Sequence, residues 1–363
     1  MKTIGIIGAG QLGMMIAEAA RELGAKTIAY DPTPSSPAFS VTDESVVGAF
    51  DDAAALEALC QRCDVVTYEF ENIPAEVLEP LCEKYNIKQG CSQLLDSQDR
   101  LREKNQAREH GLLTPEYVAV GTREELEAAV AKVGMPCVVK TRTLGYDGHG
   151  QAVIRTAKDI DAACDLLAVP CIVEEFIAFD FEISTITVRG DEKSVVFPMG
   201  RNVHRAGILD LSIVPAEISE ALRTKIEEQS KSFMEGCDYR GILTIEYFVR
   251  GEEVIFNEMA PRPHNSGHYT IEGCSTSQFK ELARYLLDMP LEEPVLVAPT
   301  IMKNILGEDL EAAKAIAEAA PAGCFVHLYG KEVSKPKRKM GHITFVGMTE
   351  EEYNEKWKSH FVS

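Results

Sequence analysis

The chain has 363 residues, 45% of them hydrophobic and 26% charged, which is the composition of a folded protein with two or three domains. Its 37 Lys and Arg residues stand against 57 Asp and Glu residues, so the net charge is −20. A chain this acidic repels nucleic-acid backbones and anionic lipid, and we expect neither as a partner. An anionic substrate then needs a local cluster of Lys and Arg.

We expect no cleavable leader, because the chain opens directly into a strand pattern. No apolar run approaches the roughly 18 residues of a membrane span. The ten cysteines are scattered, and only Cys60 and Cys63 have the spacing of metal ligands, so zinc is not expected. We therefore predict reduced thiols and a cytoplasmic location.

Strand and helix patterns alternate over the N-terminal part of the chain. Short apolar runs at residues 3–7, 26–30 and 65–68 predict strands. An amphipathic helix pattern follows the first run, and further helices are predicted to begin near Asp52 and Pro74. Strands that alternate with helices of this length predict a doubly wound parallel sheet.

The pattern changes near the middle of the chain. One charged helix is predicted over residues 95–109, and a buried strand over 136–139. Residues 172–255 are mostly strand-like, with one helix at 219–234. Consecutive strands without crossover helices predict an antiparallel sheet, so this part is α+β. Prolines between residues 290 and 299 mark a boundary, and a small terminal unit follows.

Gly8, Gly10 and Gly13 form a G-x-G-x-x-G motif between a predicted strand and a predicted helix. Free amides at such a helix start attract an anion, and Asp31 ends the second strand where a dinucleotide ribose would need it. The motif is therefore compatible with a nicotinamide or flavin enzyme. The same turn also occurs at any tight strand-to-helix junction, and Gln11 within it can contact a different ligand.

A second glycine-rich segment, residues 143–151, contains Gly145, Gly148 and Gly150. Its backbone amides can fold over phosphates, although no Walker motif follows. Lys140 ends the strand just before this loop, so its charge either reaches solvent or points into a cleft below the loop. A solvated hairpin is the alternative, but the tyrosine, aspartate and histidine among the glycines favour binding.

Two glutamates, Glu246 and Glu258, lie on two predicted strands joined by a tight turn. If the turn centres on Glu252, these glutamates are directly opposite each other on one face. Like charges opposed across strands are destabilising, so the pair needs a cation between its carboxylates. Oxygen ligands, with Asn257 adjacent, suit Mg²⁺ that carries substrate phosphates. A register slipped by one residue would instead separate the two side chains.

Three further segments carry functional residue types. The proline-rich segment 261–268 offers Arg262 as a fork for phosphate or carboxylate. Residues 174–177 close a buried strand, where backbone groups can hold adenine. A basic cluster is either a solubilising surface or an anion site, and it consists of Lys331, Lys335, Lys337, Arg338 and Lys339.

Lys140, the loop 145–151, residues 174–177 and the Glu246/Glu258 pair have the order and spacing of ATP-grasp enzymes, which the chain resembles. Within that superfamily it is most similar to the carboxylases of aminoimidazole ribonucleotide. The specific marks are the segments 8–13, 68–72, 146–151, 257–268 and 338–342. In one departure, His149 stands where many relatives carry Arg or Lys.

The resemblance implies an α/β and α+β architecture of the ATP-grasp fold. A doubly wound domain is expected over residues 1–98, an ATP-grasp domain over 99–290 with a lid at about 115–177, and a small C-terminal domain over 291–363. It further implies a ligase of purine biosynthesis. Such a ligase converts ATP, bicarbonate and aminoimidazole ribonucleotide, through carboxyphosphate, to the N-carboxylated ribonucleotide, and the family is usually homodimeric.

The resemblance also assigns roles to residues. Mg²⁺ is expected on Glu246 and Glu258. The expected ATP-binding residues are Arg100, Lys140, Gly145, Tyr146, Asp147, Gly148, His149, Gly150, Gln151, Glu174, Glu175, Phe176, Ile177, Glu182, His204, Asn257 and Glu258. The expected ribonucleotide and bicarbonate residues are Gln11, Leu12, Glu71, Asn72, Tyr146, Asp147, Arg262, Lys331, Arg338 and Lys339. The expected catalytic residues are Tyr146, Asp147, Arg262 and Lys331, with Asp147 as the candidate base for the substrate amine.

Three other functions stay open. Another ATP-grasp ligase, such as a formate-dependent glycinamide ribonucleotide transformylase, would have the same ATP-binding motifs. Its acceptor-binding motifs would differ from segment 338–342. A nicotinamide-dependent oxidoreductase would use the glycine motif at 8–13 and leave the Glu246/Glu258 pair unexplained. A non-catalytic regulator would bind ATP without turnover.

Overall fold

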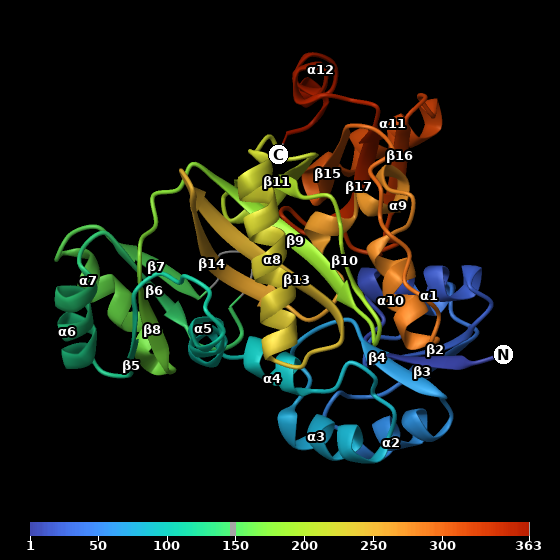
Figure 1. Ribbon diagram of the computed structural model, residues 1–363, viewed down its shortest axis with the longest axis horizontal. Helices are drawn as coiled ribbons and strands as arrows, with labels where there is room; N and C mark the ends of the chain where they lie inside the picture. Colours follow the sequence, from blue (N-terminus) through green and yellow to red (C-terminus); the bar gives the residue numbers. More distant parts are fainter. Residues whose placement is uncertain (146–149, 363) are drawn as a thin grey trace.

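The computed structural model describes residues 1–145 and 150–362. Over these residues the strands form three sheets, with the largest in the centre of Figure 1. A small sheet lies to its left, and the N-terminal sheet lies below it to the right. Every helix of the described residues is too short or too polar to cross a bilayer.

The N-terminal sheet is parallel, with strand order β3-β2-β1-β4. The predicted doubly wound arrangement is confirmed, as are both ends of β1 and β4. The sequence pattern does not predict β3, because this edge strand is mostly exposed and lacks a buried apolar run. The strands are β1 (Thr3–Ile7), β2 (Lys26–Asp31), β3 (Glu44–Val47) and β4 (Val65–Tyr68), and the helices are α1 (Gln11–Glu22), α2 (Ala53–Gln61) and α3 (Ala75–Lys84).

The predicted single helix over residues 95–109 is wrong, because two helices occupy this region. They are α4 (Ser92–Ser97) and α5 (Arg100–Glu109). Asp99 between them has an extended backbone, and its carboxylate accepts a hydrogen bond from the Leu101 N–H at 2.9 Å. An aspartate at this position caps a new helix start, so Arg100 falls on the first turn of α5.

The small sheet is antiparallel, with strand order β5-β8-β6-β7. It has its own apolar core, to which α6 contributes Leu126, Ala129 and Val130. Gly134 ends α6 with a positive φ, which glycine adopts without strain. The elements are β5 (Tyr117–Val120), α6 (Arg123–Val133), β6 (Cys137–Thr141), β7 (Gln151–Ile154), α7 (Asp159–Ala163) and β8 (Cys171–Glu175).

The large sheet has nine antiparallel strands in the order β14-β13-β9-β11-β12-β15-β17-β16, with β10 paired to β9. The prediction of an antiparallel sheet is confirmed. The strands are β9 (Phe181–Arg189), β10 (Ser194–Val196), β11 (Gly200–Arg205), β12 (Ile208–Val214), β13 (Gly241–Arg250), β14 (Glu253–Ala260), β15 (Thr300–Leu306), β16 (Cys324–Leu328) and β17 (Lys339–Val346). The helices are α8 (Glu220–Gly236), α9 (Thr270–Gly273), α10 (Gln278–Leu286), α11 (Leu310–Ala319) and α12 (Glu350–Lys356).

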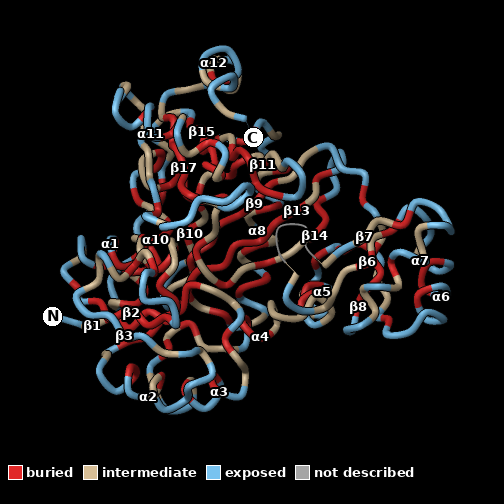
Figure 2. The backbone as a smooth tube through the Cα atoms, turned by 180° about the vertical axis from the view of Figure 1, so that it is seen from behind, coloured by how far each residue is buried: buried red, intermediate tan, exposed pale blue. Residues whose placement is uncertain are grey.

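The C-terminal strands β15, β16 and β17 extend this large sheet rather than forming a sheet of their own. The largest apolar core lies where α1 of the N-terminal part packs against α10, joining residues of both regions such as Ile16 and Leu282. Figure 2 shows the buried residues continuing from the N-terminal sheet into the large sheet. The N-terminal and central parts are therefore packed together, and the site lies where they meet.

Candidate active site

Two cavities, of about 370 Å³ and 240 Å³, open where the N-terminal sheet, the small sheet and the large sheet approach one another. They share part of their walls, which we call the junction. The larger cavity extends toward the N-terminal part, and the smaller one toward Lys140 and His204. The junction consists of Arg100, Glu246, Glu258, His264, Asn265 and Lys339.

The hairpin of β13 and β14 places Glu246 directly opposite Glu258, as predicted. The predicted turn centre is wrong, because Arg250 pairs with Glu253 and the turn therefore has only two residues. A turn that short would pair Glu246 with Asn257. A shift of register after Glu246 makes Asn257 an extra residue in β14 and restores the Glu246/Glu258 pair.

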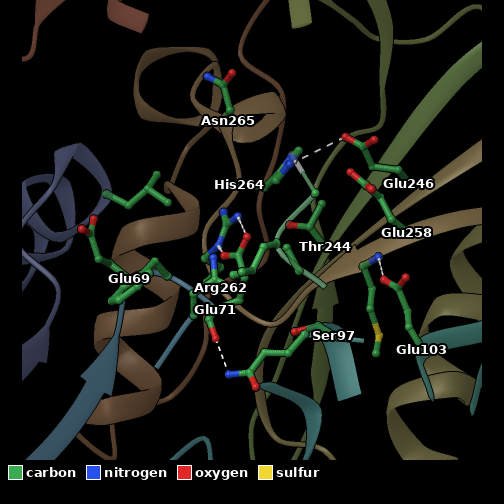
Figure 3. Close-up of a pocket in the computed structure, with 18 of the residues that line it drawn as sticks. Glu69, Glu71, Ser97, Glu103, Thr244, Glu246, Glu258, Arg262, His264 and Asn265 are labelled. Carbon is green, nitrogen blue, oxygen red and sulfur yellow. Dashed lines mark hydrogen bonds and ion pairs between the residues drawn. The ribbon is translucent and has the colours of Figure 1, made fainter. Parts of the chain in front are cut away.

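The two opposed carboxylates share their charge unequally. Burial, and next the charge of Glu258, raise the pKa of Glu246 to about 8. Burial opposes ionisation of Glu258 too, but Arg100, whose Nη1 lies 3.2 Å from Glu258 Oε2, lowers its pKa. Near neutral pH, Glu258 is thus ionised and Glu246 holds a proton, which a bound cation would displace. Figure 3 shows both side chains facing His264 across the cavity.

His264 is a neutral member of this group. Its Nε2 lies 3.7 Å from Glu246 Oε1, but burial and the nearby Arg262 lower its pKa to about 3. The contact between His264 and Glu246 is therefore not an ion pair. An uncharged imidazole here leaves the acidic pair available to a cation.

The smaller cavity carries the groups suited to phosphates and ribose. Lys140, Gln151 and Asn257 line it. His204 Nδ1 is hydrogen-bonded to the carboxylate of Glu182. Burial lowers the pKa of His204, but the hydrogen bond to Glu182 and the charges of Glu246, Glu182 and Glu258 together outweigh it, so the pKa is raised. Lys140 gives this cavity a positive side, and His204 adds a ring nitrogen that can contact an anion.

Glu174 is not in the wall of this cavity but contacts Lys140, which is. Its Oε2 is 2.7 Å from Lys140 Nζ, and its Oε1 is 3.4 Å from Lys104 Nζ. Burial alone would raise its pKa, but Lys104 and Lys140 lower it to about 2. The carboxylate is thus ionised at neutral pH and holds Lys140 in place.

The larger cavity contains a paired arginine and glutamate. Arg262 Nε and Nη2 donate to the two carboxylate oxygens of Glu71, at 2.5 Å and 3.1 Å. The Gln98 amide donates to the backbone oxygen of Glu71 at 2.6 Å. Figure 3 shows Arg262 and Glu71 facing each other. These contacts fix Glu71 in the wall of the cavity that Gln11 and Asn72 also line.

The glycine motif at residues 8–13 has its anion site filled by the chain itself. The carboxylate of Glu69 accepts hydrogen bonds from Gly10 N at 2.5 Å and Gly13 N at 2.6 Å. A Cβ atom at Gly10 would lie 2.6 Å from Glu69 Oε1, so glycine is required by this internal carboxylate. Asp31 is likewise satisfied internally, by Ala9 N at 3.0 Å and Ser36 Oγ at 2.8 Å. The dinucleotide interpretation of this motif is therefore not favoured.

Three family models match the chain. They are the ribonucleotide synthetase preATP-grasp domain over residues 1–97, the ATP-grasp domain over 105–279 and the phosphoribosylaminoimidazole carboxylase C-terminal domain over 300–356. The N5-carboxyaminoimidazole ribonucleotide synthase of Staphylococcus haemolyticus is 40% identical over 349 residues, which cover 95% of this chain and 92% of that protein. The chain belongs to the N5-carboxyaminoimidazole ribonucleotide synthase family. It is an ATP-grasp ligase.

Solved structures of this synthase family share the fold. The Staphylococcus aureus enzyme complexed with ADP has a TM-score of 0.95 at 37% identity, covering 99% of this chain and 96% of that one. The Aspergillus clavatus enzyme in complex with ADP and 5-aminoimidazole ribonucleotide has a TM-score of 0.91 at 30% identity, covering 99% and 97%. The predicted ATP-grasp fold is confirmed.

The residues expected for a synthase of this family fall into three groups. Gln11, Leu12, Glu71, Asn72, Arg100, Lys140, Gly145, Gln151, Glu182, His204, Glu246, Asn257, Glu258, Arg262 and Lys339 line the two cavities. Gly150, Glu174, Glu175, Phe176, Ile177, Lys331 and Arg338 lie outside these walls. Tyr146, Asp147, Gly148 and His149 lie outside the described residues.

Two of the basic residues outside the walls are tied to the backbone. Lys331 Nζ donates to the Lys339 carbonyl at 2.8 Å, and burial lowers its pKa to about 8. Arg338 Nη1 donates to the Val333 carbonyl at 2.6 Å. Lys331 therefore supports the strand end that carries Lys339 into the junction.

Sequence reasoning misses several wall residues of this synthase. They are Glu69, Ser97, Gln98, Glu103, Arg142, Thr244, His264, Asn265 and His268. Glu69, His264, Asn265 and His268 lie within the segments that mark the family resemblance, so those motifs held a usable signal. Ser97, Gln98, Glu103 and Arg142 reach the cavity from ordinary helical or loop patterns, and only the packing of the sheets brings them there.

Proposed function

We propose that the protein carboxylates 5-aminoimidazole ribonucleotide on its amine, with ATP and bicarbonate as co-substrates and ADP and phosphate as products. The observation that carries this proposal is the junction between the two cavities. Arg100, Glu246 and Glu258 face both cavities, so a phosphoryl group at the end of one ligand lies next to a second ligand. Phosphoryl transfer depends on such positioning and on charge neutralisation.

We assign the smaller cavity to the ATP phosphates and ribose. Lys140 and Arg100 provide positive charge, and His204, which is hydrogen-bonded to Glu182, provides a ring nitrogen. The loop 145–151 and residues 174–177 belong to the same proposal for the phosphates and the adenine. The γ-phosphate then points toward the junction.

Mg²⁺ is part of the proposal, on Glu246 and Glu258. The residues fit this ion, because two opposed carboxylates, with Asn257 beside them, offer the oxygen ligands that Mg²⁺ prefers. Among the described residues no group of three or more His, Cys, Asp or Glu is arranged around a metal position, and substrate phosphate oxygens would supply further ligands. When bound, the ion neutralises charge on the phosphates.

The chemistry follows from the placement of bicarbonate at the junction. An oxygen of bicarbonate attacks the γ-phosphorus, the bond to ADP breaks, and carboxyphosphate forms. Its cleavage gives carbon dioxide and phosphate, and the amine of the ribonucleotide attacks the carbon while losing a proton. Carboxyphosphate hydrolyses readily, so the site must exclude water. Asp147, our candidate base for the amine, and Tyr146 lie outside the described residues.

We assign the larger cavity to the ribonucleotide. Gln11, Asn72 and the Glu71–Arg262 pair supply hydrogen-bonding groups next to the junction. The ribonucleotide is an anion, and Lys339, with Lys331 and Arg338 behind it, forms the local basic group that a chain of net charge −20 requires. Arg262 and Lys331 are proposed to act in catalysis.

A homodimer and a cytoplasmic location are the remaining parts of the proposal. The ten cysteines are all free thiols, which supports a reducing compartment. The boundaries at residues 98 and 290 are likewise proposed as domain limits.

The test is phosphate release from MgATP and bicarbonate, measured with and without 5-aminoimidazole ribonucleotide. We expect release that depends on this acceptor. A parallel reaction with formate and glycinamide ribonucleotide tests the other ATP-grasp ligase. Turnover only in that reaction would overturn the acceptor assignment, and ATP binding without turnover in either would favour a regulator.

A further inference from the structure

A buried lysine connects the small sheet to the edge strand of the large sheet. Lys104 on α5 has 0% of its surface exposed. Its Nζ donates to the backbone carbonyl of Asn257 at 2.5 Å and lies 3.4 Å from Glu174 Oε1. In Figures 1 and 2, α5 lies between the small sheet and β14. Lys104 therefore contacts both sides of the site at once.

Glu174 extends this connection to the ATP side. Its second oxygen, Oε2, is 2.7 Å from Nζ of Lys140, which lines the smaller cavity. Three polar contacts thus join the Lys140 ammonium, through Glu174 and Lys104, to the carbonyl of Asn257. Asn257 is the extra residue of β14 that brings Glu258 opposite Glu246.

The neighbours of Lys104 on α5 contact the next two residues of the same strand. Arg100 lies four residues before Lys104 and three before Glu103, so on the helix surface it neighbours both. Arg100 Nη1 is 3.2 Å from the carboxylate of Glu258, and Glu103 Oε1 accepts from Met259 N at 2.6 Å. β14 is an edge strand, and side chains of α5 take the place of a neighbouring strand there.

Burying an ammonium group costs free energy, so the presence of a buried lysine indicates that its charge has a role. Removing a charged amine from water costs several kcal/mol, and an apolar side chain of similar size would avoid that cost. An apolar side chain cannot, however, hold the Glu174 carboxylate and the Asn257 carbonyl together. Lys104 is absent from the walls of both cavities, so it does not contact a ligand there itself.

We propose that Lys104 is a positioning residue for phosphoryl transfer, which fixes Lys140 of the small sheet relative to Glu258 of the large sheet. This inference rests on the proposed function. Displacement of a reacting group by about 1 Å costs up to about 100-fold in rate. Loss of Lys104 therefore lowers turnover although the residue lies behind the site.

The test compares Lys104→Met with Lys303→Met. Lys303 on β15 is also buried, with 1% exposed and its Nζ 2.6 Å from Asp210, and it lines neither cavity. Both variants lose a buried cation, and both are expected to melt at a lower temperature. Below the melting range, kcat/KM for MgATP is expected to fall about 10- to 100-fold in Lys104→Met and no more than about twofold in Lys303→Met. Equal losses in the two variants would overturn the proposal.

A double substitution separates positioning from general damage. If Lys104 acts through Lys140, adding Lys104→Met to Lys140→Met causes little further loss of kcat/KM. If the loss of kcat/KM in the double variant is the product of the losses in the two single variants, the proposal is overturned. Should Lys104→Met fail to fold, Glu174→Gln takes its place, since it keeps the shape of the link and removes its charge. Wild-type kinetics of Glu174→Gln would then be the contradicting result.

The wild-type chain provides the reference that separates this inference from the proposed function. If the wild-type protein shows no acceptor-dependent phosphate release, the proposed function is wrong. The same variants are then compared by calorimetric titration with MgADP, where Lys104→Met is expected to bind at least tenfold more weakly than Lys303→Met. Equal affinities of the two variants for MgADP would rule out the positioning role of Lys104 as well.

Discussion

Replacing Glu258 by Gln changes the charge of the junction and hardly changes its shape. Glu258 is opposite Glu246 on the neighbouring strand, and its Oε2 lies 3.2 Å from Arg100 Nη1. The substitution removes one of the two carboxylates proposed to hold Mg²⁺. It also removes the negative charge that offsets Arg100, so phosphate and cation are both held less well.

The expected magnitudes differ between turnover and stability. Removing one preorganised charged group costs about 10²- to 10³-fold in turnover, or about 2.7–4 kcal/mol, and loss of a metal ligand adds to this, so we expect turnover to be abolished. For stability, Glu246 holds a proton near neutral pH, so the substitution relieves little like-charge repulsion across the strands. Loss of the ion pair between Arg100 and the partly exposed Glu258 costs about 0–1 kcal/mol. The free energy of unfolding should therefore change by less than about 1 kcal/mol.

The assay is steady-state phosphate release with saturating substrates, together with thermal melts. Glu253→Gln is the matched control, because Glu253 is an exposed residue of the same strand that pairs with Arg250 at the hairpin end. We expect wild-type turnover from Glu253→Gln. Normal turnover of Glu258→Gln would refute the metal assignment, and unfolding of that variant would refute the estimate of its stability.

Three further substitutions test separate parts of the account. Glu69→Ala leaves Gly10 N and Gly13 N without their hydrogen-bond acceptor, which lowers the free energy of unfolding by about 1–3 kcal/mol for each, so the melting temperature should fall. A fluorescence titration of this variant should show no NAD binding. Arg262→Lys loses the two-nitrogen contact with Glu71, so the KM for the ribonucleotide should rise about tenfold and that for MgATP stay constant in steady-state assays. Burial raises the pKa of Glu246 from 4.5 to about 8, so its contribution to stability is fully present below about 4.5 and is lost as the pH rises toward 8. Melting temperatures of the nucleotide-free wild type should fall more steeply over this window than those of Glu246→Gln.

Each of these predictions has a contradicting result. NAD binding by Glu69→Ala would revive the dinucleotide interpretation. An equal rise of both KM values in Arg262→Lys would remove that residue from the acceptor side. Parallel melting profiles of wild type and Glu246→Gln would show that Glu246 does not retain its proton in the folded protein.

Local patterns in the sequence predict the elements whose signal is local. The buried strands β1 and β4 carry uninterrupted apolar runs, and both have the predicted bounds. The prediction of a single helix over residues 95–109 is wrong. The residues around Asp99 are compatible with a continuous helix, and only its hydrogen bond from Leu101 N shows that Asp99 caps a new helix. A capping residue inside a charged helix pattern is difficult to separate from an ordinary helical aspartate.

The register of the acidic pair is predicted correctly for an incomplete reason. The expectation of a turn centred on Glu252 places Glu246 opposite Glu258 by simple counting. The protein reaches the same pairing with a two-residue turn and an extra residue at Asn257. Bulges depend on contacts across the strand, here with Lys104 of α5, which counting along the sequence does not contain.

The glycine motif shows how a local signal can mislead. Its spacing fits a dinucleotide site, but the anion it binds is the carboxylate of Glu69, some sixty residues later in the chain. Only the pairing of β1 with β4 brings that side chain to the motif. Lys104 escapes sequence reasoning for the same reason, because a lysine in a charged helix is usually solvated, and its burial depends on the packing of α5 between the small sheet and β14.

In the proposed reaction, phosphoryl transfer at the junction activates bicarbonate. The most direct measurement uses bicarbonate labelled with ¹⁸O and follows the label into the phosphate released in the presence of 5-aminoimidazole ribonucleotide. Because a bicarbonate oxygen attacks the γ-phosphorus and stays on it when carboxyphosphate breaks down, each phosphate should carry one ¹⁸O atom. Phosphate free of ¹⁸O, formed while the ribonucleotide is carboxylated, would contradict the account.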